Sequence, residues 1–314
     1  MYFAIIDLGT NTFHLVIVKK NAHQTTPVYK AQIPTKIGKS GINQGIITEE
    51  AIQRALTVLT QFRQKTDEWN IPVDHITAIG TSAIRNASNA PTFCQAIFEA
   101  TGITVEVISG DREAELIYEG VKQALDLEQS PSLVMDIGGG SVEFIICNQS
   151  RIFWKQSFEI GGQRLLEKFV STDPISASAI QRLSNYLEEE LLPLLNAAHQ
   201  YAPKILVGSS GSFDTLVEMD FMNRLGNFPD AQQTGFELSL SEFERAYELI
   251  TTKNREQRLA IPGMIELRVD LIVPAVVLIA YVLKALQINR IRTSTYALKE
   301  GVLAWVLSKN QSLQ

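Results

Sequence analysis

Cysteine and histidine are both scarce in this sequence, which contains two cysteines and four histidines among its 314 residues. Two cysteines cannot build a disulfide framework or a cluster of zinc ligands. Cys94 and Cys147 both lie in apolar surroundings, so we expect them to be small core residues. The sequence therefore excludes a disulfide-stapled fold and a zinc-cluster protein.

Long hydrophobic segments are also missing. The longest apolar run, LIVPAVVLIAYVL at residues 271–283, is shorter than the ~18–20 residues that span a bilayer. The N-terminal stretch MYFAIIDLG has no basic segment before its apolar residues and no cleavage site, so no signal peptide is expected. We therefore predict a cytoplasmic protein without a membrane partner.

An excess of basic residues is absent as well, because the formal net charge is −6. This balance does not favour nucleic acid as the main partner. An anionic substrate would have to be held by local backbone N–H groups, metal ions and a few Lys or Arg side chains. The apolar content of 45% and the charged content of 20% are those of a globular protein, and the length suggests two domains.

Strands and helices are expected to alternate along the chain, which is typical of the α/β class. Residues 48–69 have helical periodicity, with Thr48 in a capping position and acids in the first turn. The pattern begins again around residues 126–132, and a long helical region follows residue 160. Strands are expected at 2–7, 13–20, 75–81, 104–109, 133–137, 142–149, 151–160 and 288–295, and further helices at 90–101, 112–125, 241–254, 271–286 and 294–308.

An internal repeat is the most informative feature of the sequence. The stretch IIDLGTNTFHLVIV at residues 5–18 aligns with VMDIGGGSVEFIIC at residues 134–147. Each half thus contains a strand, an acid, a turn of small residues and a second strand. We expect two stacked domains with a cleft between their hairpin turns. The aligned pairs are Asp7 with Asp136, Gly9 with Gly138, Thr12 with Ser141, and His14 with Glu143.

Two familiar phosphate-binding motifs fail on inspection. IGKS at residues 37–40 matches the end of a Walker A loop, but Ile33 stands where the first glycine is required. Gly138 and Gly140 match the start of a dinucleotide fingerprint, but Glu143 replaces its third glycine and a strand follows. GSSGS at residues 208–212 lies between a strand and a helix, where it is either an anion site or a plain tight turn.

The paired hairpins are a stronger signal for phosphate chemistry. Backbone N–H groups in a glycine-rich turn can converge on a phosphate, and small side chains leave room for its oxygens. The acids beside the turns would repel phosphate unless a divalent cation lies between them, and Mg²⁺ prefers one or two carboxylates with water and phosphate oxygens. The alternative is two ordinary tight turns with exposed acids.

The sequence resembles the exopolyphosphatase / guanosine pentaphosphate phosphohydrolase family of the actin / sugar kinase / heat-shock chaperone superfamily. The chain ends soon after LKEGVLAW, as in the short, two-domain members. The matching stretches are AIIDLGTNTFHLVIV (4–18), GTSAIRNASN (80–89), VISGDREAELIYEGV (107–121), VMDIGGGSVEFII (134–146), VGSSGSFDTL (207–216), IPGMIELRVDLIVPA (261–275) and TSTYALKEGVLAW (293–305).

The resemblance implies an α/β fold of two duplicated ribonuclease-H-like (actin-like ATPase) domains. Each would have a mixed five-stranded sheet flanked by helices, with an interdomain cleft between the two. Domain I would comprise residues 1–125 with a C-terminal helix at about 298–314, and domain II residues 126–297.

The resemblance also implies Mg²⁺-assisted hydrolysis of a terminal phosphate of polyphosphate, or of the 5′ γ-phosphate of a guanosine alarmone. It places the catalytic base on Glu113, within SGDREAE. By position alone, Glu113 would be read as an acid that complements a helix dipole, and the matching segment reverses that interpretation. The family pattern S-G-x-E-E-A-R is broken on both sides, by Arg112 and by Glu115.

The remaining site residues follow from the hairpins and the resemblance together. Asp136, Glu143 and Asp7 are expected to hold Mg²⁺, and a monovalent cation such as K⁺ is compatible with the resemblance. Each acid could instead be structural, Arg85 could be a surface arginine, and His14 either contacts phosphate or is solvated. The expected phosphate and substrate contacts are Gly9, Thr10, Asn11, Thr12, Ser82, Arg85, Gly138, Gly139, Gly140, Ser141, Ser210, Gly211 and Ser212.

Three functions remain open at this stage. The leading one is a phosphatase acting on polyphosphate ends or on pppGpp. A kinase or ATPase of the same superfamily would need an adenosine pocket, which GSSGS alone does not identify. A non-catalytic phosphate-sensing module is disfavoured because Glu113, Asp136 and Glu143 are all present. The family and the apolar C-terminal helices also suggest a homodimer.

Overall fold

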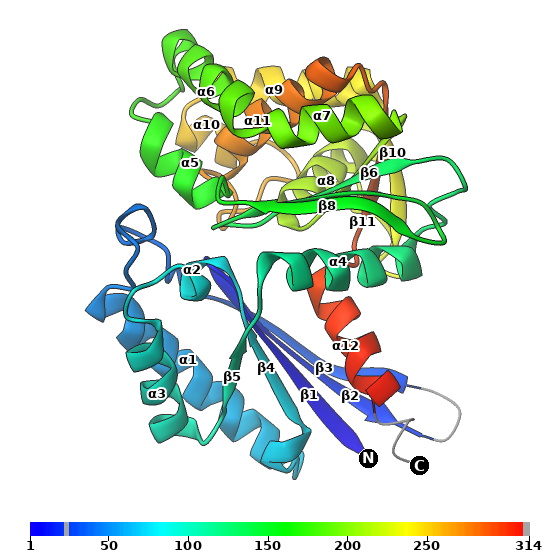
Figure 1. Cartoon of the computed structure of the whole chain (residues 1–314). Coiled ribbons are helices and arrows are strands. Elements are labelled where there is room, and N and C mark those ends of the chain that lie inside the picture. Colours follow the sequence, from blue (N-terminus) through cyan, green and yellow to red (C-terminus); the bar gives the residue numbers. More distant parts are fainter. Residues whose placement is uncertain (22–24, 310–314) are drawn as a thin grey trace. The chain divides into compact units, whose positions relative to one another are not determined.

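A computed structural model describes residues 1–21 and 25–309 (Figure 1). The chain forms two compact units, one of residues 1–113 with the chain from Val302 on, the other of residues 114–301. Both divisions fall inside helices, namely α4 (Gly110–Ala124) and α12 (Leu298–Lys309). The predicted domain limits, after residue 125 and before residue 298, lie at the end of α4 and the start of α12.

The first unit is built on a mixed sheet with the order β3-β2-β1-β4-β5, five strands within the described ranges. β1, β2 and β3 form an antiparallel meander, whereas β4 and β5 run parallel to β1. Helix α1 (Glu49–Glu68) begins at Thr48, whose side chain accepts a hydrogen bond from the Ala51 N–H as predicted. The strands are β1 Tyr2–Leu8, β2 Thr12–Lys20, β3 Thr25–Pro34, β4 Ile76–Gly80 and β5 Val105–Val107.

Helices α1 and α3 (Ala90–Thr101) lie side by side along this sheet (Figure 1). The apolar faces of these helices and the inner side chains of the meander form one core. Its buried residues include Phe13 of β2, Leu59 of α1 and Phe93 of α3. The short helix α2 (Ser82–Arg85) follows β4, and two 3-10 turns lie at Ile42–Gln44 and Val73–His75. The carboxyl ends of β1, β4 and β5 therefore meet at one edge of the sheet.

The second unit has a sheet with the order β10-β11-β9-β6-β7-β8, six strands among the described residues. The expectation of five strands is wrong here because the short segment β10 (Gly235–Leu238) pairs with β11 (Arg290–Ser294). A four-residue edge strand is too short to show a clear alternation and depends on its neighbour for hydrogen bonds. The other strands are β6 Ser132–Ile137, β7 Val142–Cys147, β8 Ile152–Phe158 and β9 Ile205–Ser209.

An apolar core joins the second sheet to its covering helices. The predicted helix at 294–308 begins only at Leu298, because residues 290–294 belong to β11. The long helical region after residue 160 is divided into α5, α6 and α7. The helix bounds are α5 Gly162–Phe169, α6 Ala177–Glu190, α7 Leu192–Tyr201, α8 Gly211–Leu225, α9 Leu240–Thr252, α10 Arg255–Leu259 and α11 Ile272–Leu286.

Both units share one topology, in which a three-stranded meander leads to parallel strands beside its first strand. This duplicated ribonuclease-H-like arrangement confirms the predicted fold class. In the two hairpins Asp7 lies opposite His14, and Asp136 lies opposite Glu143, so the aligned residues of the repeat occupy matching positions. Gly9 and Gly138 also match, since an added Cβ would lie 2.9 Å from the Thr12 carbonyl oxygen and 3.0 Å from that of Ser141.

Cys147 is fully buried and Cys94 is partly buried against the core of the first unit; both are free thiols. Throughout residues 1–21 and 25–309, none of the helices combines the length and the apolar character that a membrane span requires.

Candidate active site

In the first unit, three predicted site segments lie at the shared carboxyl edge of β1, β4 and β5. The hairpin turn Gly9–Asn11 follows β1, the segment Thr81–Arg85 follows β4, and Ser109–Glu113 follows β5. The Thr81 hydroxyl lies 3.5 Å from the Leu8 carbonyl oxygen, and the Ile108 N–H donates to the Gly80 carbonyl at 3.1 Å. Ligands of open α/β sheets bind at such edges.

Glu113 lies in the first turn of α4 and is buried, with 6% of its surface exposed. Ser109 caps this helix start, because its hydroxyl accepts a hydrogen bond of 3.2 Å from the Arg112 N–H. Arg85 Nη1 donates to Glu113 Oε2 at 2.8 Å and to the Ile108 carbonyl at 3.2 Å. The predicted base and the predicted phosphate-binding arginine are therefore joined as an ion pair.

The turn of the first unit is followed into β2 by buried polar side chains. Asn11 and Thr12 are buried, yet both amide atoms of Asn11 and the Thr12 hydroxyl have no hydrogen-bond partner among the described residues. Buried polar groups in proteins are nearly always paired. These atoms are therefore suited to a polar ligand or to ordered water.

In the second unit a row of polar residues crosses the sheet at one level. Ser157, Glu143, Asp136, Ser209 and Ser294 are successive register partners on β8, β7, β6, β9 and β11. Glu143 and Asp136 are buried, with 1% and 5% of their surfaces exposed. Two acids thus lie on neighbouring strands inside a row of hydroxyl groups.

Serine hydroxyls bind both of these acids. Ser209 Oγ donates to Asp136 Oδ2 at 2.6 Å, and Ser210 Oγ lies 2.9 Å and 2.8 Å from its two oxygens. Glu143 Oε1 accepts hydrogen bonds of 2.7 Å from each of Ser141 and Ser157. Ser141 and Ser210, expected to contact phosphate, thus contact the acids in this structure.

Burial raises the pKa of Asp136, although the hydrogen bonds from Ser209 and Ser210 and the charges of Lys299 and Arg268 oppose the rise. A cation beside this carboxylate would relieve that penalty. The described part of the chain contains no group of three His, Cys, Asp or Glu side chains arranged to hold a metal. Two carboxylates fit Mg²⁺, which takes its other ligands from water and phosphate.

Arg268, which was not among the predicted site residues, interacts by charge with Asp136. A Cβ at Gly211 would lie 2.1 Å from Arg268 Nη2, so the guanidinium lies directly on the first residue of α8. Burial lowers the pKa of Arg268, and the carboxylates of Asp214, Asp136 and Glu218 oppose that effect. Arg268 lies in IELRVD, within one of the matching stretches, but nothing local distinguishes it from an arginine at an ordinary helix start.

Ser209, Ser157 and Asp214 were also missed. Ser209 precedes the predicted loop by one residue, and only the pairing of β9 with β6 places it against Asp136. Ser157 depends in the same way on the pairing of β8 with β7. Asp214 follows Ser212 by two residues in the first turn of α8, and its charge interacts with those of Arg268 and Lys299.

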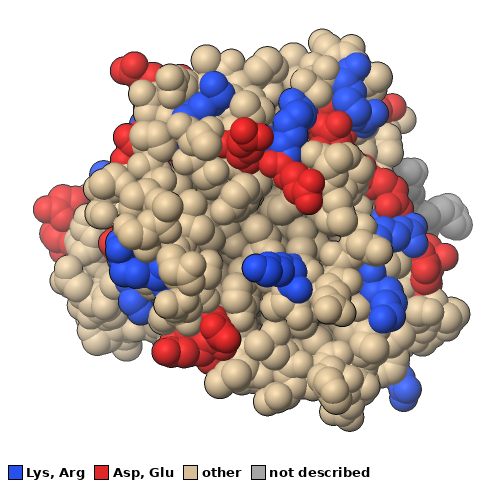
Figure 2. All heavy atoms as spheres, turned by 90° about the horizontal axis from the view of Figure 1, so that it is seen from above, with Lys and Arg blue, Asp and Glu red and all other residues tan. Residues whose placement is uncertain are grey.

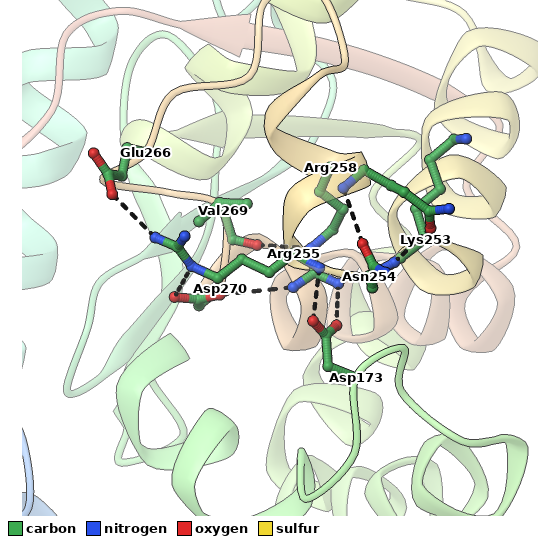
Figure 3. A network of polar contacts seen from close by, with 9 residues as sticks. Asp173, Lys253, Asn254, Arg255, Arg258, Glu266, Val269 and Asp270 are labelled. Carbon is green, nitrogen blue, oxygen red and sulfur yellow. Dashed lines mark hydrogen bonds and ion pairs between the residues drawn. The ribbon is translucent and has the colours of Figure 1, made fainter.

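A polar network holds the segment that contains Arg268 (Figure 3). Arg258 is buried, with 2% of its surface exposed, and its Nε donates to the Val269 carbonyl at 2.9 Å. Its Nη1 donates to Asp173 Oδ1 at 2.6 Å and to the Lys253 carbonyl at 2.7 Å. Arg255 contacts Asp270 at 3.4 Å. Because Val269 and Asp270 follow Arg268 directly, the network fixes the backbone beside it.

A separate groove of about 880 Å³ lies on the helical face of the second unit. Its lining comes mainly from α6, α7 and α11 and includes Glu188, Lys204, Tyr247 and Tyr281. Seen from above, acidic and basic side chains are interspersed on a mostly uncharged surface (Figure 2). The groove contains none of the predicted site residues.

Asp214→Asn is expected to stabilise the protein increasingly as the pH rises. Burial, with Glu218 and Asp136, raises the pKa of Asp214 from 3.8 to about 7, against the opposing charges of Lys299 and Arg268. Between these values the folded state keeps a proton that the unfolded chain has lost, so wild-type stability falls with pH. Denaturant unfolding at several pH values should show that the difference in unfolding free energy between the variant and the wild type increases from pH ~4 to ~7 and is constant above that.

Glu244→Gln on α9 is the control, because it replaces an exposed acid by its amide. A stability difference between Asp214→Asn and wild type that is constant from pH ~4 to ~8 would contradict the assignment.

The duplicated fold, with an acid at the end of the first strand in each half, is that of the actin-like ATPase-type proteins. More narrowly, the chain belongs to the Ppx/GppA phosphatase family, whose model matches residues 16–310.

Solved structures of similar proteins cover the whole described fold. An exopolyphosphatase from Cytophaga hutchinsonii ATCC 33406 is 46% identical and superposes with a TM-score of 0.94, covering 98% of both chains. A Ppx/GppA family member from Aquifex aeolicus is 25% identical, with a TM-score of 0.79 over 99% of both chains.

Longer relatives are similar over part of their length. A guanosine-5′-triphosphate,3′-diphosphate pyrophosphatase from Photobacterium profundum is 28% identical over 307 residues, which are 98% of this chain. A protein of the same name from Vibrio vulnificus is 26% identical over the same length. The chain spans 59% of the length of each of these curated relatives.

Proposed function

We propose that this protein is a Mg²⁺-dependent phosphohydrolase that releases terminal phosphate from inorganic polyphosphate, the 5′ γ-phosphate of pppGpp, or both. The ion pair between Arg85 and the buried Glu113 carries the proposal, because it lies at the ligand-binding edge of the first sheet. Membership of the Ppx/GppA phosphatase family and the similarity to an exopolyphosphatase support it.

Glu113 is the proposed base for in-line attack by water. The water oxygen forms a bond to the terminal phosphorus, the anhydride P–O bond breaks, and the water proton passes to Glu113. The first turn of α4 favours the ionised carboxylate that this step needs. The Arg85 guanidinium can bind phosphate oxygens in a fork, so we infer that substrate draws Arg85 away from Glu113 and frees the base.

Asp136 and Glu143 are the proposed Mg²⁺ ligands, and the ion when bound would neutralise charge on the phosphate oxygens. Asp7, at the matching position of the first repeat, is proposed for a metal or water role. Backbone N–H groups of the turns at Gly9–Thr12 and Gly138–Ser141 would donate to phosphate oxygens. The unsatisfied polar atoms of Asn11 and Thr12 support this role for the first turn.

Polyphosphate and pppGpp are both supported as substrates by the comparisons. The exopolyphosphatase from Cytophaga hutchinsonii matches this chain over nearly its full length, whereas the pppGpp-directed relatives are longer proteins. We therefore propose polyphosphate first and pppGpp second.

The proposal is tested by measuring phosphate release from polyphosphate, pppGpp and ATP at equal concentrations of Mg²⁺. We expect release from polyphosphate or pppGpp, weak release from ATP, and loss of activity when EDTA removes the metal. ATP as the best substrate would favour the ATPase alternative. Activity on none of the three, or full activity in EDTA, would overturn the proposal.

A further inference from the structure

The three glycines of the hairpin turn Gly138–Ser141 in the second unit accept hydrogen bonds from the start of α5. The N–H groups of Gly161, Gly162 and Gln163 donate to the carbonyls of Gly140, Gly138 and Gly139 at 3.1, 2.9 and 2.8 Å, respectively. Arg164 Nε adds a bond of 2.9 Å to the Gly140 carbonyl. All three carbonyl oxygens of the turn are therefore bound by one short segment.

This contact fixes where the N–H groups of the turn point. In a trans peptide unit the C=O and the N–H that follows it point in opposite directions. Holding the carbonyls of Gly138, Gly139 and Gly140 toward α5 thus directs the N–H groups of Gly139, Gly140 and Ser141 away from it. Among the described residues no protein acceptor takes a hydrogen bond from any of these three N–H groups.

Glycine at position 161 is required by this contact and not by its own backbone. Gly161 has φ −64° and ψ 162°, an extended conformation that any residue adopts. An added Cβ, however, would lie 2.4 Å from the Gly140 carbonyl carbon and 2.5 Å from that of Gly139. Two backbones meet here at a separation that leaves no room for a methyl group.

The first unit contains an equivalent device. After β3, the N–H groups of Thr35 and Lys36 donate to the Asn11 carbonyl at 3.0 and 2.9 Å, and that of Gly38 donates to the Thr10 carbonyl at 3.0 Å. In each unit, therefore, the segment after the third strand of the meander binds the carbonyls of the hairpin turn. Because the same arrangement occurs in both repeats, we attribute it to a shared function of the two turns and not to local packing in one unit.

We propose that Gly161 is a positioning residue, which allows α5 to hold the Gly138–Gly140 turn with its N–H groups aimed at a phosphate chain. The proposal rests on the proposed function in so far as that chain is the substrate. Gly161 itself does not contact the ligand. A side chain at this position would push the turn away from α5 and rotate its peptide units out of alignment.

Binding of tripolyphosphate with Mg²⁺, measured by calorimetry in the Glu113→Gln background, tests the inference without hydrolysis. Adding Gly161→Ala should weaken binding by about 10- to 100-fold, because hydrogen bonds to a charged ligand are misplaced. Gly162→Ala is the matched control: its Cβ would lie no closer than 3.7 Å to any neighbour, and the N–H is kept. We expect it to bind within about twofold of the parent.

Arg164→Gln is the second variant if Gly161→Ala does not fold, as judged by its melting curve. It removes one donor to the turn without adding bulk, and binding should weaken several-fold. Equal affinities for the Gly161→Ala and Gly162→Ala variants would overturn the inference, as would a parent that does not bind tripolyphosphate. A parent that binds while the wild type releases no phosphate would instead refute the proposed activity.

Discussion

Glu113→Gln is expected to lower kcat for phosphate release by roughly 10²- to 10⁴-fold, the range that general-base catalysis supplies. Glutamine keeps the size of the side chain, and its carbonyl can still accept a hydrogen bond from Arg85, but it cannot accept a proton from water. Its buried position and its 2.8 Å contact with Arg85 make the Glu113 carboxylate sensitive to substitution. Single-turnover phosphate release with the best substrate would measure the effect.

Glu115→Gln is the matched control for that experiment. Glu115 lies in the same helix but is half-exposed and pairs with Lys155 at 3.1 Å, so its loss should change kcat by less than about threefold. Melting curves for both variants would separate catalysis from folding. A Glu113→Gln enzyme with more than about a tenth of wild-type kcat would show that the base lies elsewhere.

The departures from the family pattern around Glu113 have local partners in the structure. Arg112 lies over the Trp305 ring, with its guanidinium carbon 5.0 Å from the ring centre. Glu115, which takes the place of the usual arginine, is paired with Lys155. Arg112 and Glu115, the two residues that differ from the family pattern, thus each have a contact within their own unit. The first turn of α4, which positions Glu113, is still formed.

The fold could be predicted because its signals are local and repeated. A strand, an acid, a small-residue turn and a second strand appear twice, and the register that places Asp136 opposite Glu143 follows from the turn length. The strand β10 was missed because only pairing with β11, more than fifty residues later, makes its four residues a strand.

The side-chain contacts of the site could be predicted only in part. Ser209 and Ser210 reach Asp136 from 73 and 74 positions along the chain, through a parallel pairing that no local pattern encodes. The contact between Arg85 and Glu113 likewise depends on two strand ends meeting at one edge of the sheet. Whether Asp136, Glu143 and Asp7 hold Mg²⁺ stays a prediction.

The loop that presents Arg268 is held by long-range contacts of Gly263 and Arg258. Gly263, with φ +88°, brings this loop so close to α8 that a Cβ would lie 2.6 Å from the Glu218 carbonyl carbon. Arg258 then ties Val269 to Asp173 and Lys253. Position 268 is thus fixed from both ends of the loop.

Arg258→Met is therefore expected to destabilise the second unit by about 3 kcal/mol. Methionine can fill the buried space, but it removes the donor that Arg258 supplies to the Val269 and Lys253 carbonyls and to Asp173 Oδ1. For a domain of this size that loss lowers Tm by about 6–12 °C. Thermal unfolding followed by circular dichroism would measure it.

Arg255→Gln is the control that compares the contribution of the buried Arg258 to stability with that of Arg255 in the same network. Arg255 also pairs with Asp270 and Glu266, but its side chain is half-exposed, and its backbone N–H would still donate to Asp173 Oδ2. Screening by water makes such exposed pairs weak, so Tm should barely change. Equal shifts for the two variants would mean that the network acts through surface charge. A large shift for Arg258→Met alone, together with weaker substrate binding, would show that the buried guanidinium holds the Arg268 loop in place.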